Sequence, residues 1–243
     1  DHRLHPGIAL GVLAVLVALP WVAHAIDQPF YLVLATRILI FALVASSLNL
    51  LVGFGGLVSF GHAAFFGGGA YVVGILAHHG ITLAWIAWPA AAVLSALAAW
   101  IIGAISLRTR GVYFIMITLA FAQMMYYVFV SMKTYGGEDG LPIATRSWLA
   151  PGLDLKSDIA FYYVVLLIVT GGFVFLARLI GARFGYVLQG IRDNETRMEA
   201  MGYPVIRYKR IAFVISGALA GLGGALLANQ NGLASPNLLQ WIQ

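Results

Sequence analysis

The chain contains no cysteine and few charged residues. Its 243 residues include 14 Lys and Arg and 9 Asp and Glu, so that 9% are charged, against about 25% in an ordinary globular domain. Without cysteine there is no disulfide framework, thiolate zinc site or redox thiol. The net charge of +5 is spread thinly between long hydrophobic stretches, so no basic face for nucleic acid is expected.

Motifs for nucleotide hydrolysis and for common catalytic sites are also missing. A phosphate-binding loop needs Gly-Lys-Ser or Gly-Lys-Thr, and none of Lys133, Lys156 and Lys209 follows a glycine. There is no G-x-S-x-G, no H-E-x-x-H and no run of side chains at metal-ligand spacing. We therefore expect no enzyme, no metal site and no cofactor bound by this chain.

Hydrophobic residues dominate instead, at 61% of the chain. Crossing a bilayer takes roughly 20 apolar residues, and in lipid each such segment must pair its own backbone groups as a helix. Seven stretches qualify: 8–26, 31–52, 57–78, 82–106, 113–131, 160–180 and 211–229. The predicted fold is all-α, a polytopic transmembrane helix bundle that forms a single domain over residues 1–243.

Basic residues predict which side each connection faces, because cytoplasmic loops are enriched in Lys and Arg. The link after the fourth stretch contains Arg108 and Arg110, and the connection 181–210 contains six basic residues: Arg183, Arg192, Arg197, Arg207, Lys209 and Arg210. Two stretches separate these regions, so both can face the cytoplasm. The N-terminus is then expected inside, while links 27–30, 79–81 and 132–159 and residue 243 are expected outside.

The connection 181–210 contains an amphipathic stretch, GYVLQGIRDNETRMEAMG (185–202). Apolar residues recur in it near helical spacing, at Val187, Leu188, Ile191, Met198 and Met201. Asp193 and Arg197 are four residues apart and are expected to pair. Gly202 is expected to end the helix, and Pro204 to prevent its continuation. One short cytoplasmic helix is predicted.

This helix has mixed charges on its polar face. Helices that lie on headgroups favour Lys and Arg there, but Asp193, Glu195 and Glu199 are acidic. A protein partner is therefore favoured over lipid. The alternative is a helix that only packs beneath the bundle.

The segment 53–74, GFGGLVSFGHAAFFGGGAYVVG, has eight glycines in 22 residues. Glycines permit close helix packing, and they also mark the broken helices that line transport sites; both interpretations stay open. His62 is either a hydrogen-bonded bundle residue or part of a path, and Gln123 either lines a path or bonds between helices. The candidate pathway residues are Gly61, His62, Phe65, Phe66, Gly68 and Gln123.

The predicted outer loop 132–159 is longer than most connections. Within it, Gly136-Gly137-Glu138-Asp139-Gly140 is typical of a turn that presents two carboxylates. Glu138 and Asp139 are candidates for binding a solute-binding protein, and the alternative is a loop that caps the bundle.

Three segments together resemble one family. RDNETRMEAMGYPVIRYKRIAFVISGALAGLGGAL resembles the cytoplasmic loop and following helix of branched-chain amino acid ABC-importer permeases of the larger-subunit type. SLNLLVGFGGLVSFGHAAFFGGGAYVVGIL resembles their Gly-rich membrane segment, and LRTRGVYFIMITLAFAQMMYYVFV followed by YGGEDGL is also similar. Urea and short-amide permeases share these motifs. The family continues with further hydrophobic helices beyond the position of Ser235-Pro236-Asn237, so we expect that this chain is truncated at its C-terminus, the alternative being that its far end differs from the family.

The resemblance implies a bacterial inner-membrane complex. Its partners would be a second, paralogous permease, two cytoplasmic ATPase subunits that use ATP and Mg, and a periplasmic solute-binding protein, with the chain itself set in membrane lipid. Glu199-Ala200-Met201-Gly202 is similar to the ATPase-docking loop of importers, with its glycine placed earlier. Since the chain has no ATPase motif, helix 186–202 is the expected contact, through Arg192, Asp193, Glu195, Glu199 and Gly202.

The predicted function is thus a permease subunit of an ATP-driven importer for branched-chain or related hydrophobic amino acids. The alternative is a secondary transporter or channel for small polar solutes, or, within the family, a urea or amide permease. An ion-coupled transporter usually has acidic residues within its spans, and all nine acids here lie outside the spans.

Overall fold

The computed structural model describes residues 6–25, 29–143, 146–148 and 157–240. The predicted all-α bundle is confirmed. The helices are α1 (Pro6–Ala25), α2 (Pro29–Asn49), α3 (His62–His78), α4 (Ala84–Ser106), α5 (Val112–Ser131), α6 (Asp158–Gly181), α7 (Arg183–Asp193), α8 (Glu195–Ala200) and α9 (Val205–Asn231). Short elements join them: the π-helical turn η1 (Leu50–Phe54), the 3-10 turns η2 (Lys133–Tyr135) and η3 (Pro236–Leu239), and the strands β1 (Leu141–Pro142) and β2 (Leu233–Ala234).

Within the described residues, five segments are long and apolar enough to cross a membrane: Phe30–Phe54, Ala84–Ser106, Val112–Ser131, Asp158–Gly181 and Val205–Asn231. Each of the seven expected stretches contains a helix, but two boundaries were wrong. α3 begins at His62 rather than at residue 57, and α9 begins at Val205 rather than at 211. The connection 181–210 therefore includes the first turns of α9.

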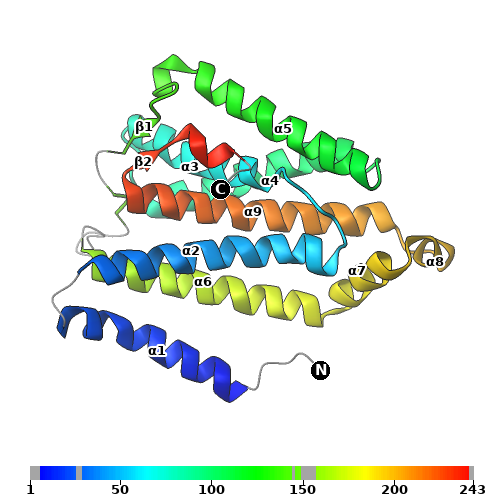
Figure 1. Ribbon diagram of the computed structural model, residues 1–243, viewed down its shortest axis with the longest axis horizontal. Coiled ribbons are helices and arrows are strands. Elements are labelled where there is room, and N and C mark those ends of the chain that lie inside the picture. Colours follow the sequence, from blue (N-terminus) through cyan, green and yellow to red (C-terminus); the bar gives the residue numbers. More distant parts are fainter. Residues whose placement is uncertain (1–5, 26–28, 144–145, 149–156, 241–243) are drawn as a thin grey trace.

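α9 runs through the middle of the bundle, with α2 and α6 on one side and α3, α4 and α5 on the other, while α1 lies at the edge (Figure 1). In the most apolar 18-residue stretch of α9, 67% of the residues are buried, against 17% in the corresponding stretch of α5. Small residues make this central position possible, because they let helix backbones approach closely.

Glycines form the crossing of α3 and α9. A Cβ added at Gly69 would overlap the carbonyl group of Gly221, and one at Gly224 would overlap the carbonyl oxygen of Phe66. By contrast, a Cβ at Gly68 would meet only the methyl carbon of Met125, at 3.5 Å. Close packing therefore explains some of the glycines in segment 53–74 but not all of them.

The same segment also contains a break between helices. α2 continues into η1, residues 55–61 are irregular, and α3 starts at His62. Gly56 lies within the irregular part with φ +65°, a conformation that favours glycine. The segment thus has features of both open interpretations, close packing along α3 and a break before it, and the break lies at the end of the bundle near α7 and α8 (Figure 1).

A proline in α1 explains how this helix is attached. Pro20 has no N–H to donate to the carbonyl of Leu16. The hydroxyl of Tyr162 on α6 donates to that oxygen at 2.7 Å, and Tyr163 donates to Val17 O at 3.2 Å. The Leu16 carbonyl that Pro20 leaves without a helical partner is thus satisfied by a neighbouring helix, as an apolar environment requires.

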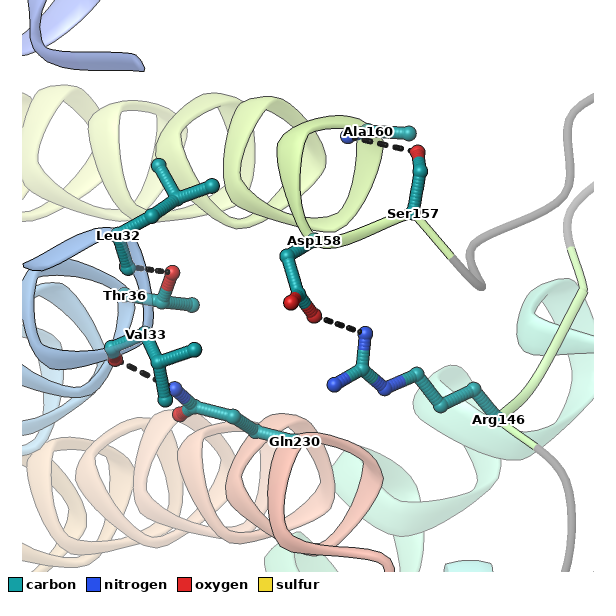
Figure 2. Close-up of polar contacts among 8 residues, drawn as sticks. All are labelled: Leu32, Val33, Thr36, Arg146, Ser157, Asp158, Ala160 and Gln230. Atoms are coloured by element: carbon teal, nitrogen blue, oxygen red, sulfur yellow. Dashed lines mark hydrogen bonds and ion pairs between the residues drawn. The ribbon is translucent and has the colours of Figure 1, made fainter. Parts of the chain in front are cut away.

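The opposite end of the bundle is held by short polar contacts. β1 pairs with β2, and the Asn229 side chain of α9 accepts from the N–H and hydroxyl of Ser147 at 2.9 and 2.8 Å. Figure 2 shows the Arg146–Asp158 ion pair, at 2.6 Å, and the bond from Gln230 to Val33 O, also at 2.6 Å. These contacts join the connection after α5 to α2, α6 and α9.

After β2 the chain turns back along α3. A Cβ at Gly67 would meet Leu239 Cγ at 2.5 Å, and Leu239 is fully buried. Residue 243, which the sequence predicts to lie on the outer side of the membrane, is not among the described residues.

Candidate coupling site and cavity

The stretch 185–202 forms two helices rather than the single one predicted. α7 ends at Asp193, Asn194 is extended with φ −156° and ψ 98°, and α8 begins at Glu195. The Asn194 side chain accepts from the N–H of Arg197 at 2.9 Å, which is an N-cap interaction. Asp193 binds the guanidinium of Arg192 instead of Arg197, so the expected pairing of Asp193 with Arg197 was wrong. The break between the two helices separates these residues.

Gly202 ends α8, as predicted. It has φ +85°, its N–H donates to Glu199 O at 2.9 Å, and the N–H of Tyr203 donates to Met198 O at 3.1 Å. This pair of bonds is the Schellman arrangement, in which a left-handed glycine satisfies the last carbonyls of a helix. The chain therefore reverses direction at Gly202.

A small apolar cluster fixes α7 and α8 to the start of α9. It consists of Val187, Ile191, Met198 and Val205. Leu188 lies beside it and packs instead against the main bundle. Of the five residues in the predicted apolar stripe, Met201 differs: it is 58% exposed, because α8 ends before it.

An ion-pair network joins α8 to the rest of the chain. The ammonium of Lys209 on α9, a residue only 9% exposed, binds Glu195 Oε2 at 2.9 Å. Arg110, in the link between α4 and α5, lies 3.5 Å from Glu195 and 3.6 Å from Glu199. These pairs place Arg110 beside α8, so the two basic regions lie at the same end of the bundle.

Arg192 points away from α8 and toward the break after η1. Its Nη1 donates to Gly53 O at 2.6 Å, and its Nε and Nη2 donate to Asp193 Oδ1 at 3.1 and 3.0 Å. A Cβ added at Gly56 would meet Arg192 Cγ at 2.7 Å. Arg192 therefore lies directly over the irregular residues.

The five predicted contact residues thus divide into two groups. Asp193, Glu199 and Gly202 are exposed at the tip, where Glu199 also lies 3.6 Å from Arg110. Glu195 binds Lys209, and Arg192 binds Gly53 O. We define the coupling surface as the exposed residues Asp193, Arg197, Glu199, Met201, Gly202 and Tyr203. Sequence reasoning missed Arg197, Met201 and Tyr203, and the partners Arg110 and Lys209. For Arg110 and Lys209, the only signal in the sequence was their positive charge.

The candidate pathway residues are not gathered at one place. Phe65 and Gly68 line a cavity of about 160 Å³ between α3, α4 and α5, whose other lining residues are Ala64, Val72, Leu94, Ser95, Ala98, Met125 and Phe129. Gly61 lies against Thr118 of α5, and Phe66 is buried in the core against Phe41. Gln123 is half-buried on α5. The cavity is smaller than the roughly 300 Å³ of the smallest usual ligand pockets.

His62 joins three helices. Its Nε2 lies 3.0 Å from the Ser47 hydroxyl of α2 and 3.3 Å from the Ser216 hydroxyl of α9. The Ser216 hydroxyl also donates to Ser47 O. This geometry fits the hydrogen-bonded bundle residue that was one of the two interpretations of His62.

Glu138 and Asp139 lie on a tight turn after η2 and are exposed. Gly136, Gly137 and Gly140 around them all have positive φ, and Asp139 N donates to Gly136 O at 3.1 Å. The turn follows α5 at the end of the bundle opposite to α8 (Figure 1). The described parts of this connection also cap the bundle, through β1 and Ser147.

Comparison with known proteins identifies the family. The family profile described as branched-chain amino acid transport system, permease component, matches residues 30–243. Two curated relatives, both named high-affinity branched-chain amino acid transport system permease protein LivM, come from Salmonella typhimurium LT2 and Escherichia coli K12. Each is 30% identical over 226 residues, covering 84% of this chain and 53% of the relative.

The chain therefore spans about half the length of these two relatives. No solved structure matches it. The family is one of transporter components rather than enzymes, and the apolar helices agree with a multi-pass membrane protein. We conclude that the chain belongs to the permease family of branched-chain amino acid ABC transport systems.

Proposed function

We propose that the chain is a permease subunit of an ATP-driven importer in a bacterial inner membrane, and that it carries branched-chain or related hydrophobic amino acids inward. Its partners would be a paralogous permease, two cytoplasmic ATPase subunits, which supply ATP and Mg chemistry, and a periplasmic solute-binding protein. The end with α7 and α8 then faces the cytoplasm together with the N-terminus. The exposed Glu138–Asp139 turn faces the solute-binding protein.

The coupling surface is the observation that best supports this proposal. It combines charged side chains of both signs with the exposed Met201 and Tyr203, on an element fixed by the cluster of Val187, Ile191, Met198 and Val205. Exposed Met and aromatic side chains are enriched at protein interfaces. The sequence contains no phosphate-binding loop, so in this proposal a separate ATPase supplies the energy through that surface.

The cavity beside Gly68 supports a passage for apolar side chains. Ser95 is the one polar side chain in its lining, which suits a hydrophobic solute. At about 160 Å³, it must widen before an amino acid passes. Such widening is expected when the ATPase subunits close and displace α7 and α8.

Two substitutions on the coupling surface test the ATPase contact. We expect Glu199→Lys and Met201→Asp each to reduce co-purification with the ATPase subunit by about tenfold or more, because replacing a hot-spot residue costs about 2 kcal/mol or more and about 1.4 kcal/mol is tenfold in affinity. Arg183→Glu is the matched control, since Arg183 is exposed at the other end of α7. Gly202→Trp is less informative, because φ +85° at Gly202 makes any side chain there strain the turn itself.

The measurement is the amount of ATPase retained on the purified permease, together with leucine uptake by vesicles. If both surface variants retain the ATPase as well as Arg183→Glu does, the coupling surface is assigned incorrectly. Uptake of urea in place of leucine would contradict the proposed substrate class but not the contact.

A further inference from the structure

We propose that Arg192 is the positioning residue that transmits displacement of α7 to the break between α2 and α3, and so to the cavity. This inference rests on the proposed function, in which an ATPase moves α7. It assigns to Arg192 a role inside the permease, instead of the partner contact that its charge and position in the sequence suggested.

The first support is the hydrogen bond that Arg192 makes. The last carbonyls of a helix have no partner within that helix, and the helix dipole places partial negative charge there. α2 and η1 form one continuous run that ends at Phe54. The Arg192 guanidinium donates to Gly53 O at 2.6 Å, so a cation on α7 caps the end of that run.

The second support is the way in which the guanidinium is oriented. Both Nε and Nη2 bind Asp193 Oδ1, which leaves Nη1 directed at Gly53 O. The carboxylate therefore restricts the side chain to this direction. Below it, the Arg192 stem lies against Gly56, where a Cβ would come within 2.7 Å of Cγ. Arg192 thus reaches the break through one hydrogen bond and one steric contact.

The third support is what lies beyond the break. Residues 55–61 lead directly into α3, whose third, fourth and seventh residues, Ala64, Phe65 and Gly68, line the cavity. Leu188 on the same face of α7 packs in one cluster with Leu50, Leu51, Leu57 and Phe65. Movement of α7 would therefore shift the start of α3 and the wall of the cavity together.

The test uses the complete transporter in vesicles and measures ATP hydrolysis and leucine uptake separately. For Arg192→Ala we expect normal assembly with the ATPase and retained hydrolysis, but about tenfold less uptake per ATP, a typical size for coupling between sites. Arg192→Lys keeps a cation at this position and should recover part of the uptake. Gly56→Ala crowds the Arg192 stem from the other side and also strains the backbone at φ +65°, so it should lower uptake per ATP as well and is compared only alongside Arg192→Ala.

Arg183→Ala is the control, because it removes one positive charge from the same helix far from Gly53. The inference is overturned if hydrolysis and uptake fall in proportion in Arg192→Ala. It is also overturned if uptake per ATP stays unchanged in both Arg192→Ala and Gly56→Ala. Failure of the wild-type permease to bind any ATPase would instead contradict the proposed function. Since the chain has no cysteine, a nitroxide pair at Tyr186→Cys on α7 and Val58→Cys in the break, both exposed positions, gives a second readout. The distance between the labels should stay fixed between nucleotide states in the parent chain and change in Arg192→Ala.

Discussion

Replacing Gly69 with alanine is expected to prevent correct packing of the bundle, whereas replacing its neighbour Gly68 is expected to be tolerated. A methyl group at Gly69 would overlap the backbone of Gly221 on α9, and backbone cannot move aside as a flexible side chain can. At Gly68 the methyl group would meet only the end of Met125, at 3.5 Å. Alanine favours a helix over glycine by about 1 kcal/mol in water, so the overlap alone makes Gly69→Ala unfavourable.

Overpacking usually costs about 1–3 kcal/mol and sometimes more, and we expect Gly69→Ala to lie at or above the upper end. The measurement is the yield and melting temperature of folded protein in detergent. Gly171→Ala is a second control, because nothing lies within 4 Å of a Cβ at this position of α6. Equal melting temperatures for Gly69→Ala and Gly68→Ala would contradict the close crossing of α3 and α9.

Replacing Glu195 with alanine is expected to release α8 from the bundle and to stop transport. The substitution leaves the ammonium of Lys209, a residue only 9% exposed, without its partner at 2.9 Å. Breaking a fully buried pair costs about 3–5 kcal/mol. Because the Glu195 side chain is partly exposed, we expect about 2 kcal/mol. The loss acts at the junction of α8 and α9.

A single introduced cysteine can report this release, because the chain has none of its own. Met198 is the buried residue of α8 and packs against α7 and α9, so the thiol of Met198→Cys should react slowly with a water-soluble maleimide. We expect Glu195→Ala to raise the labelling rate about tenfold or more. Arg110→Ala should raise it little, since Arg110 is largely exposed and surface pairs contribute about 0–1 kcal/mol. Similar rates in the two variants would mean that Lys209 does not hold α8.

Composition and periodicity were sufficient to predict the helices, because a span is defined by about 20 apolar residues in a row. They also predicted the end of α8, since a glycine before a proline has local consequences for the backbone. The break at Asn194 had a local signal as well: an Asn followed by Glu195 is typical of a helix start. The apolar residues on both sides of it keep helical spacing, and this periodicity concealed the break.

The contacts of the coupling element could not be predicted. Glu195 binds Arg110, which is 85 residues away in the sequence, and Arg192 binds Gly53 O across 139 residues. The sequence pattern of an amphipathic helix is the same whether a charged residue in it faces a partner protein or the bundle of its own chain. The cavity was likewise only partly predicted, because which glycines face a helix backbone and which face open space depends on the rotation of α3.

The central claim is that this permease provides a route for solute and obtains its energy through contact with a separate ATPase. Uptake of labelled leucine by sealed vesicles tests it most directly. Vesicles that contain the permease with the ATPase subunits are compared with vesicles that contain the permease alone, inserted in the same orientation. The account predicts accumulation against a gradient only when the ATPase subunits, ATP and Mg are present together. Accumulation by this chain alone, without nucleotide or any partner subunit, would contradict it.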